Sequence, residues 1–116
     1  MKRRLGYFLF AVQIGLAQLV FGETAQRVVD IPTRPGVTQR FLYLSPGSPK
    51  AAVILFAGGE GGLQISPEGA LKWGAGNFLV RTRQQFAEKG LAVAVVDAPS
   101  DHQSYPYLSG FRQKPE

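Results

Sequence analysis

Two short segments of this chain consist almost entirely of apolar residues, and they constrain its fold more than any other feature. They are residues 51–57, with the sequence AAVILFA, and Leu91–Val96, with the sequence LAVAVV. Continuous apolarity is typical of a β-strand covered on both faces, as in a parallel sheet, whereas a strand with one solvated face alternates. The two segments therefore predict a pair of parallel strands.

A single helix is predicted between these two strands. Asn77 is a favourable N-cap because its side chain can accept a hydrogen bond from the first turn, and Gly90 suits the left-handed position that ends a helix. The face expected to pack on the sheet carries Leu79, Thr82, Phe86 and Ala87. A strand, a helix and a second parallel strand form a crossover unit, which is right-handed in nearly all proteins.

Two further strands are predicted before this unit, at residues 27–31 and 39–44. The prolines and the glycine between them are typical of a turn, so these strands are expected to form an antiparallel hairpin. Segment 58–76 is a long glycine-rich loop, and segment 97–116 is expected to be irregular coil because it shows no periodic pattern. The predicted fold class is α/β, with an N-terminal hairpin and one parallel strand–helix–strand unit.

Residues 1–22 have the three parts of a secretory signal peptide. Three basic residues precede an apolar stretch at positions 5–20, and Gly22 is small enough to precede a cleavage site. Cleavage there gives a mature chain that begins at Glu23, and cleavage after Ala17 is the alternative. The prediction places the mature chain in the periplasm or outside the cell.

The competing interpretation of this segment is an uncleaved anchor in the inner membrane. A spanning helix needs about 20 apolar residues. The stretch here is shorter and is interrupted by Gln13 and Gln18, which are unfavourable in hydrocarbon. The signal peptide is therefore preferred, and residues 23–116 are the predicted domain under either interpretation.

Charge and cysteine content exclude several functional classes. Three of the 13 Lys and Arg residues lie at positions 2–4, and the charges of the remaining chain are nearly balanced and interspersed. A nucleic-acid partner needs a basic stripe, which this pattern does not provide. The chain has no cysteine, which excludes disulfides, thiolate metal sites and a cysteine nucleophile. No metal or cofactor is predicted.

Two segments are expected to lie close together at the carboxyl ends of the parallel strands, where ligands bind in such sheets. The first is the glycine loop, residues 58–62 with the sequence GGEGG, and the second is residues 97–101 with the sequence DAPSD. Glycines allow sharp turns and let backbone N–H groups point towards an anion. The loop is predicted to be either an oxyanion-binding loop or a mobile turn, and the residues alone favour neither.

A nucleotide-binding use of the glycine loop is disfavoured by the residues that follow it. No Lys-Ser or Lys-Thr pair completes a phosphate-binding loop. A dinucleotide fingerprint needs a third glycine where Gln64 stands, and it needs a helix to begin directly afterwards. A nucleotide-binding module is thus a distant third hypothesis.

Four segments, taken in order, resemble the N-terminal portion of bacterial α/β-hydrolase-like proteins. They are residues 40–44 (RFLYL), 52–62 (AVILFAGGEGG), 76–81 (GNFLVR) and 93–101 (VAVVDAPSD). The resemblance covers roughly residues 27–116, and it rests on the order and spacing of the segments. It implies a partial α/β-hydrolase-like sheet, in which the strand at Leu91–Val96 lies between the second and third strands. It also implies an esterase-type serine hydrolase and a small-molecule, ester-like substrate.

The same resemblance assigns roles to the two segments at the strand ends. The glycine loop resembles the oxyanion-hole loop, although the usual His-Gly-Gly-Gly sequence is absent. The oxyanion-hole candidates are Gly58, Gly59, Glu60 and Gly61. The turn after the fourth strand lines the site in that family, and the site-lining candidates here are Asp97, Ser100 and Asp101.

The catalytic residues of that family are not found in this chain. Its nucleophile lies in a G-x-S-x-G-like elbow after a fifth strand. None of the six serines lies in such a sequence, and the nearest match, Ser109 before Gly110, has Tyr107 in place of the first glycine. His102 is the only histidine and is expected to be a surface or loop residue, because the family's catalytic histidine lies near the C-terminus of the full protein.

The chain ends on Lys-Pro-Glu, a pattern typical of a helix start, so we expect a fragment of a longer protein that is inactive alone. Without a fifth strand, the strand at residues 51–57 would be an exposed apolar edge, which favours self-association. The alternative is a small secreted or membrane-tethered binding module with no catalytic function.

Overall fold

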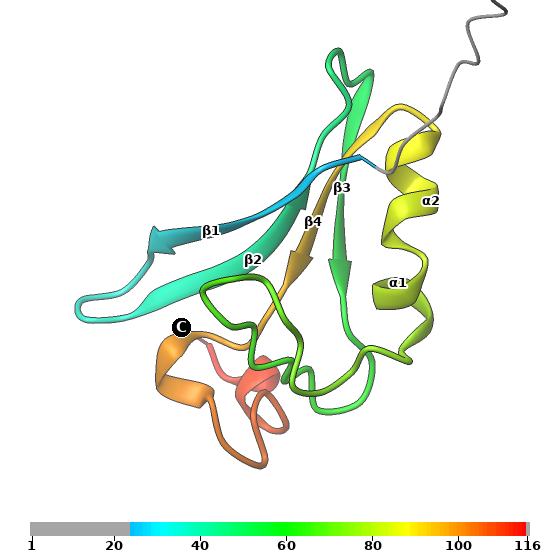
Figure 1. The fold of residues 1–116 in the computed structure, drawn as a ribbon. Helices are drawn as coiled ribbons and strands as arrows, with labels where there is room; N and C mark the ends of the chain where they lie inside the picture. Colours follow the sequence, from blue (N-terminus) through cyan, green and yellow to red (C-terminus); the bar gives the residue numbers. More distant parts are fainter. Residues whose placement is uncertain (1–23, 116) are drawn as a thin grey trace, which may run out of the picture.

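The computed structural model describes residues 24–115, which form a mixed four-stranded sheet with helices against one face (Figure 1). The strands are β1 (Gln26–Pro32), β2 (Thr38–Leu44), β3 (Ala51–Phe56) and β4 (Leu91–Val96). The helices are α1 (Phe78–Arg81) and α2 (Arg83–Glu88), followed after β4 by the short 3₁₀ helices η1 (Ser100–His102) and η2 (Phe111–Gln113). The signal peptide predicted for residues 1–22 lies outside the described part of the chain.

The strand order in the sheet is β1-β2-β4-β3. β2 pairs antiparallel with both β1 and β4, and β4 pairs parallel with β3 from Ala51↔Leu91 to Phe56↔Val96. The predicted hairpin and the predicted parallel strand–helix–strand unit are both confirmed, and the fold is mixed α/β. β4 lies between β2 and β3, which is the order that the hydrolase resemblance implies, and β3 is an edge strand among the described residues.

The single helix predicted between β3 and β4 is in fact two short helices. Its ends are as expected: Asn77 Oδ1 accepts from the N–H of Leu79 at 3.2 Å, and Gly90 has a φ of 87°. The helix is interrupted at Thr82, whose buried hydroxyl donates to the carbonyl of Phe78 at 2.6 Å. Such a bond to the carbonyl four residues earlier competes with the regular helix ladder and bends helices.

The two helices and the segment after the glycine loop cover one face of the sheet. Leu42 is paired with Val95 and Leu44 with Val93, so these four side chains point to the same side, and all are fully buried. Val80 of α1 and Ala87 of α2 pack on them, as do Leu55, Ala57, Leu63 and Ile65. Burial of each large aliphatic side chain contributes about 1.5–3 kcal/mol, which makes this face the core.

The opposite face of the sheet, here called the open face, carries apolar side chains without a covering helix among residues 24–115 (Figure 1). It includes Ile31, Phe41, Tyr43, Ile54 and Phe56, of which Ile54 is 60% and Phe56 is 55% exposed. The continuous apolarity of β3 predicts cover on both faces. The structure differs from that prediction, because within the described residues β3 is covered only on its core face.

The segment after β4 is irregular, as predicted, with turns and the two 3₁₀ helices. It folds back beneath the carboxyl ends of β3 and β4, where it meets the glycine loop (Figure 1). No helix within residues 24–115 has the length and apolarity needed to cross a membrane.

Candidate functional site

The glycine loop and the turn after β4 lie side by side, as expected for segments that follow neighbouring parallel strands. The glycine loop leaves the end of β3, and Asp97 directly follows the end of β4. The register that pairs Phe56 with Val96 brings both exits to the same edge of the sheet. This edge is where ligands bind in open α/β sheets.

The carboxylate of Asp97 holds the segment after the glycine loop in place. Its Oδ1 accepts hydrogen bonds from the N–H groups of Leu63 at 2.8 Å, Gln64 at 3.2 Å and Ala98 at 2.7 Å, and its Oδ2 accepts from Ile65 at 2.9 Å. Asp97 is only 1% exposed. A buried carboxylate is unfavourable unless hydrogen-bond donors surround it, and four backbone N–H groups supply them here.

The N–H groups of the glycine loop itself, unlike those of residues 63–65, have no hydrogen-bond acceptor in the described part of the chain. Among residues 24–115, no hydrogen bond has the N–H of Gly58, Gly59, Glu60 or Gly61 as its donor. Gly59 and Gly61 have φ values of 67° and 79°, a left-handed conformation that favours glycine. The four oxyanion-hole candidates thus lie together in one turn, and their N–H groups have no acceptor among residues 24–115, although Gly61 itself is buried.

The end of the described chain is packed against the glycine loop. The N–H of Leu108 donates to the carbonyl of Glu60 at 3.0 Å. The guanidinium of Arg112 donates to the carbonyls of Gly59 at 3.2 Å and Ala57 at 3.4 Å. This packing needs glycine in the loop, because a Cβ at Gly61 would clash with Arg112, and one at Gly62 would clash with the ring of Tyr107.

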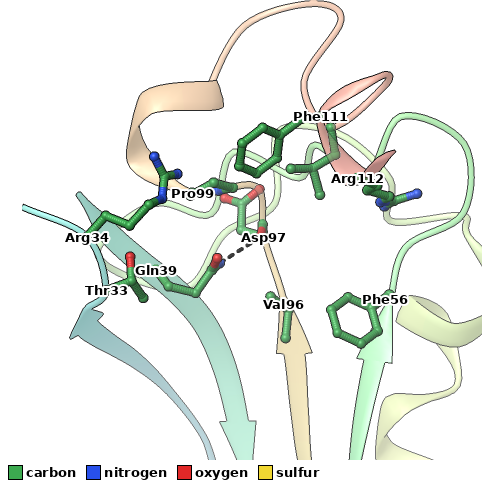
Figure 2. A pocket seen from close by; sticks show the side chains of 10 residues that line it. Thr33, Arg34, Gln39, Phe56, Val96, Asp97, Pro99, Phe111 and Arg112 are labelled. Atoms are coloured by element: carbon green, nitrogen blue, oxygen red, sulfur yellow. Dashed lines mark hydrogen bonds between the residues drawn. The ribbon is translucent and has the colours of Figure 1, made fainter. Parts of the chain in front are cut away.

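A hollow of about 620 Å³ lies between this segment and the open face of the sheet (Figure 2). Phe56 and Val96 line it from the strand ends, and Phe111 and Arg112 line it from η2. The other lining residues are Thr33, Arg34, Gln39, Asp97, Pro99 and Leu108. Gln39 closes one side, because its amide donates to the carbonyl of Asp97 at 2.7 Å.

Two of the site-lining candidates, Ser100 and Asp101, are used elsewhere. The hydroxyl of Ser100 accepts from the N–H of Thr38 at 2.9 Å, which attaches η1 to β2. The carboxylate of Asp101 binds the guanidinium of Arg34 through two bonds of 2.9 and 3.2 Å. Asp97 lines the hollow, but Ser100 and Asp101 join the segment after β4 to the hairpin.

The described residues do not assemble a catalytic triad. His102 Nδ1 lies 2.9 Å from Asp101 Oδ1, and its ring stacks on Phe111 with centroids 4.0 Å apart. Within residues 24–115, no serine hydroxyl is hydrogen-bonded to His102. The same part of the chain holds no group of three or more His, Asp or Glu side chains arranged to bind a metal ion.

Several residues of the site were not anticipated from the sequence. Tyr107, Leu108 and Arg112 lie in a segment without any pattern, about fifty positions after the loop that they contact. Arg40 also contributes, because it pairs with Asp30 across the hairpin while its Nη1 donates to the carbonyl of Ile65 at 3.0 Å. Arg40 lies on the same face of β2 as the buried Leu42 and Leu44, and the sequence gives no sign of this contact.

The charged groups at the hairpin make a pH-dependent contribution to stability. The hydrogen bond from His102, followed by that from Arg34, lowers the pKa of the exposed Asp101 from 3.8 to about 2. A lowered carboxylate pKa means that the stabilising contribution is present above pH 3.8 and is lost as the pH falls towards 2. The link between η1 and the hairpin is therefore expected to weaken only in strong acid.

Titration of the Asp101 carboxyl carbon by NMR tests this expectation. The wild-type midpoint should lie near pH 2, and Arg34→Gln should move it upward because one of the two donors is removed. The difference in unfolding free energy between wild type and Asp101→Asn should shrink as the pH falls from 4 towards 2. A wild-type midpoint close to 3.8 would contradict the role of Asp101 described here.

The Asp97→Asn substitution is expected to destabilise the protein by about 2–3 kcal/mol. The amide keeps one acceptor oxygen but places an NH₂ group against an N–H that the carboxylate now binds, so at least one buried donor loses its partner. Urea denaturation measures the loss, and hydrogen exchange should show faster exchange at Leu63, Gln64 and Ile65.

The matched control for this variant is Asp30→Asn, which disrupts an ion pair near the surface. It should change the free energy of unfolding by less than about 1 kcal/mol. Equal effects of the two substitutions would show that the four bonds to Asp97 have no special importance.

We compared the chain with known protein families, curated proteins and solved structures. No protein family, no curated protein and no solved structure matches the chain. The four-stranded sheet and its helices establish a mixed α/β fold. The narrower resemblance to α/β-hydrolases stays a prediction, and the function is argued from the site alone.

Proposed function

We propose that this chain is the N-terminal part of an exported α/β-hydrolase-like protein of the esterase type. In this proposal the glycine loop binds the oxyanion that forms when the carbonyl of a small ester-like substrate is attacked. The observation that carries the proposal concerns the N–H groups of Gly58–Gly61. None of them has a hydrogen-bond acceptor among residues 24–115.

Three features of the structure support this use of the loop. It lies at the carboxyl end of β3, beside the end of β4, in a sheet of order β1-β2-β4-β3. The loop leads directly into the segment at residues 63–65, and hydrogen bonds to Asp97 hold that segment in place. Donors arranged before the reaction stabilise developing negative charge without reorganisation, and this is commonly the largest single contribution to catalysis of acyl transfer.

The proposal assigns no catalytic nucleophile or base within the described residues. Attack on an ester carbonyl by a serine needs a histidine within hydrogen-bond distance, and His102 instead contacts Asp101 and Phe111. We therefore propose that the nucleophile and the catalytic histidine are supplied by sequence outside this chain, and that the chain alone is inactive.

The proposed location is the periplasm or the cell exterior, and it rests on the basic and apolar pattern of residues 1–22. An inner-membrane anchor is the alternative for that segment. Both alternatives place the glycine loop on the same side of the membrane, because the basic residues precede the apolar stretch.

A second candidate function is an interaction module, and the edge of the sheet favours it. β3 pairs with β4 on one side and, within residues 24–115, with no strand on the other. It carries no charged residue, and Ile54 and Phe56 are more than half exposed. An apolar edge strand is a template for pairing with another chain, so a second copy is the proposed partner.

Ester hydrolysis tests the first proposal, with 4-nitrophenyl butyrate as substrate. The 116-residue chain should release nitrophenolate no faster than buffer, whereas the chain extended through the downstream reading frame should be active. Because a surface imidazole can hydrolyse such esters slowly, the His102→Ala variant of each form is the control, and it should leave the activity of the extended form unchanged. Absence of activity from the extended form, or of any such frame, would contradict the proposal.

Sedimentation velocity over a range of concentrations tests self-association through β3. The full chain should associate, and Ile54→Lys should shift it towards monomer because a charge would be placed on the paired edge. Ile31→Lys is the matched control, since Ile31 is 44% exposed but lies on β1, at the opposite edge of the sheet. A chain that stays monomeric at all concentrations, or variants with equal effects, would argue against pairing through β3.

A further inference from the structure

The hollow next to the glycine loop has the size and the lining of a small-molecule site. Its volume of about 620 Å³ lies within the range of roughly 300–1,000 Å³ that ligand pockets occupy. Most of the surface is apolar, and it is formed by Phe56, Val96, Pro99, Leu108 and Phe111. A ligand held there would therefore present an apolar body to these side chains.

Of the charged groups that line the hollow, Arg112 is the one without a carboxylate partner among residues 24–115. Arg34 and Asp101 bind each other, and the Asp97 carboxylate is occupied by four N–H groups. The guanidinium of Arg112 donates only to the carbonyls of Gly59 and Ala57, and among residues 24–115 no carboxylate lies within ion-pair distance of it. The positive charge of Arg112 is thus not neutralised by the described part of the chain.

The walls of the hollow are positioned by contacts outside it. The ring of Phe111 stacks on His102, and the guanidinium of Arg34 lies 5.3 Å from the centroid of the same ring. The two carbonyls that accept from Arg112 fix its guanidinium beside the glycine loop. A site whose groups are ordered before binding needs less conformational entropy to be lost when the ligand arrives.

We propose that this hollow binds a small amphiphilic monocarboxylate. The apolar part of the ligand packs between Phe56, Val96 and Phe111, and its carboxylate accepts hydrogen bonds from Arg112 at the edge. This inference goes beyond the proposed hydrolase function, because such binding needs neither a nucleophile nor an oxyanion.

A carboxylate fits the edge better than other charged groups. The planar guanidinium has five N–H donors in a fork that matches a carboxylate, and two of them are used by Gly59 and Ala57. A single cation suits a monoanion, whereas a phosphate dianion favours a cluster of cations. A cationic ligand would be repelled by Arg112.

Binding of octanoate and of 1-octanol to the full chain tests the proposal, since the two ligands differ in charge but have the same apolar tail. A titration followed by ¹H–¹⁵N NMR should show shifts at residues 56–61 and 108–112 for octanoate. Octanoate should bind about tenfold more tightly than octanol, which is the effect expected from one charge-assisted hydrogen bond. Two results with the wild-type chain would overturn the inference. The first is equal affinity for octanoate and octanol, and the second is that the shifts fall only on Ile31, Phe41 and Ile54 of the open face.

Substitutions then identify the group that recognises the charge. Arg112→Gln should weaken octanoate binding about tenfold and leave octanol unchanged. Phe56→Ala should weaken both ligands, and Arg81→Gln, a change of an exposed arginine on α1, should affect neither. An Arg112→Gln variant that binds octanoate as well as wild type would falsify the assignment, and inactivity of every form in ester hydrolysis would leave it unaffected.

Discussion

The bonds between the Asp97 carboxylate and four backbone N–H groups organise the functional end of this fold. Asp97 follows β4, so its position is fixed by strand pairing, and Leu63, Gln64 and Ile65 come from a loop that has no strand of its own. The carboxylate and the loop N–H groups depend on each other. A buried carboxylate without donors is unfavourable, and so are buried N–H groups without acceptors. Asp97 thereby fixes this irregular loop together with the loop's own backbone contacts, such as the bridge between Ile65 and Leu71.

The two faces of the sheet differ in a way that affects both candidate functions. The core face is closed by α1, α2 and the segment fixed by Asp97. The open face leaves Ile54 and Phe56 largely exposed, and the hollow is formed where the segment after β4 covers only the carboxyl end of that face. The exposed apolar surface at β3, through which pairing with another chain is proposed, is thus continuous with the wall of the proposed ligand site.

Local sequence patterns were sufficient for the elements of the fold but not for the contacts of the site. The apolar runs, Asn77 and Gly90 predicted the strands and both ends of the helical segment, because these features depend on near neighbours. The interruption at Thr82 escaped prediction, since the pattern does not say whether a hydroxyl will compete with the helix ladder.

The candidate site also shows that local sequence patterns do not predict contacts between distant residues. Parallel strand ends predicted that the glycine loop and Asp97 would lie together, and they do. The sequence placed Ser100 and Asp101 near Asp97, but it gave no sign of their contacts with the N–H of Thr38 and the guanidinium of Arg34 in the hairpin. These contacts join residues more than sixty positions apart, and no local periodicity encodes them.

The packing of Leu108 and Arg112 on the glycine loop has a consequence for the order in which the chain acquires its structure. The four strands, α1 and α2 have all emerged once synthesis has passed Val96 at the end of β4, because chains are made with the N-terminus first. The loop carbonyls of Glu60 and Gly59 then still lack their donors, which come from Leu108 and Arg112. The glycine loop is therefore expected to reach the shape described here only after residues 108–112 have emerged, later than the strands that flank it.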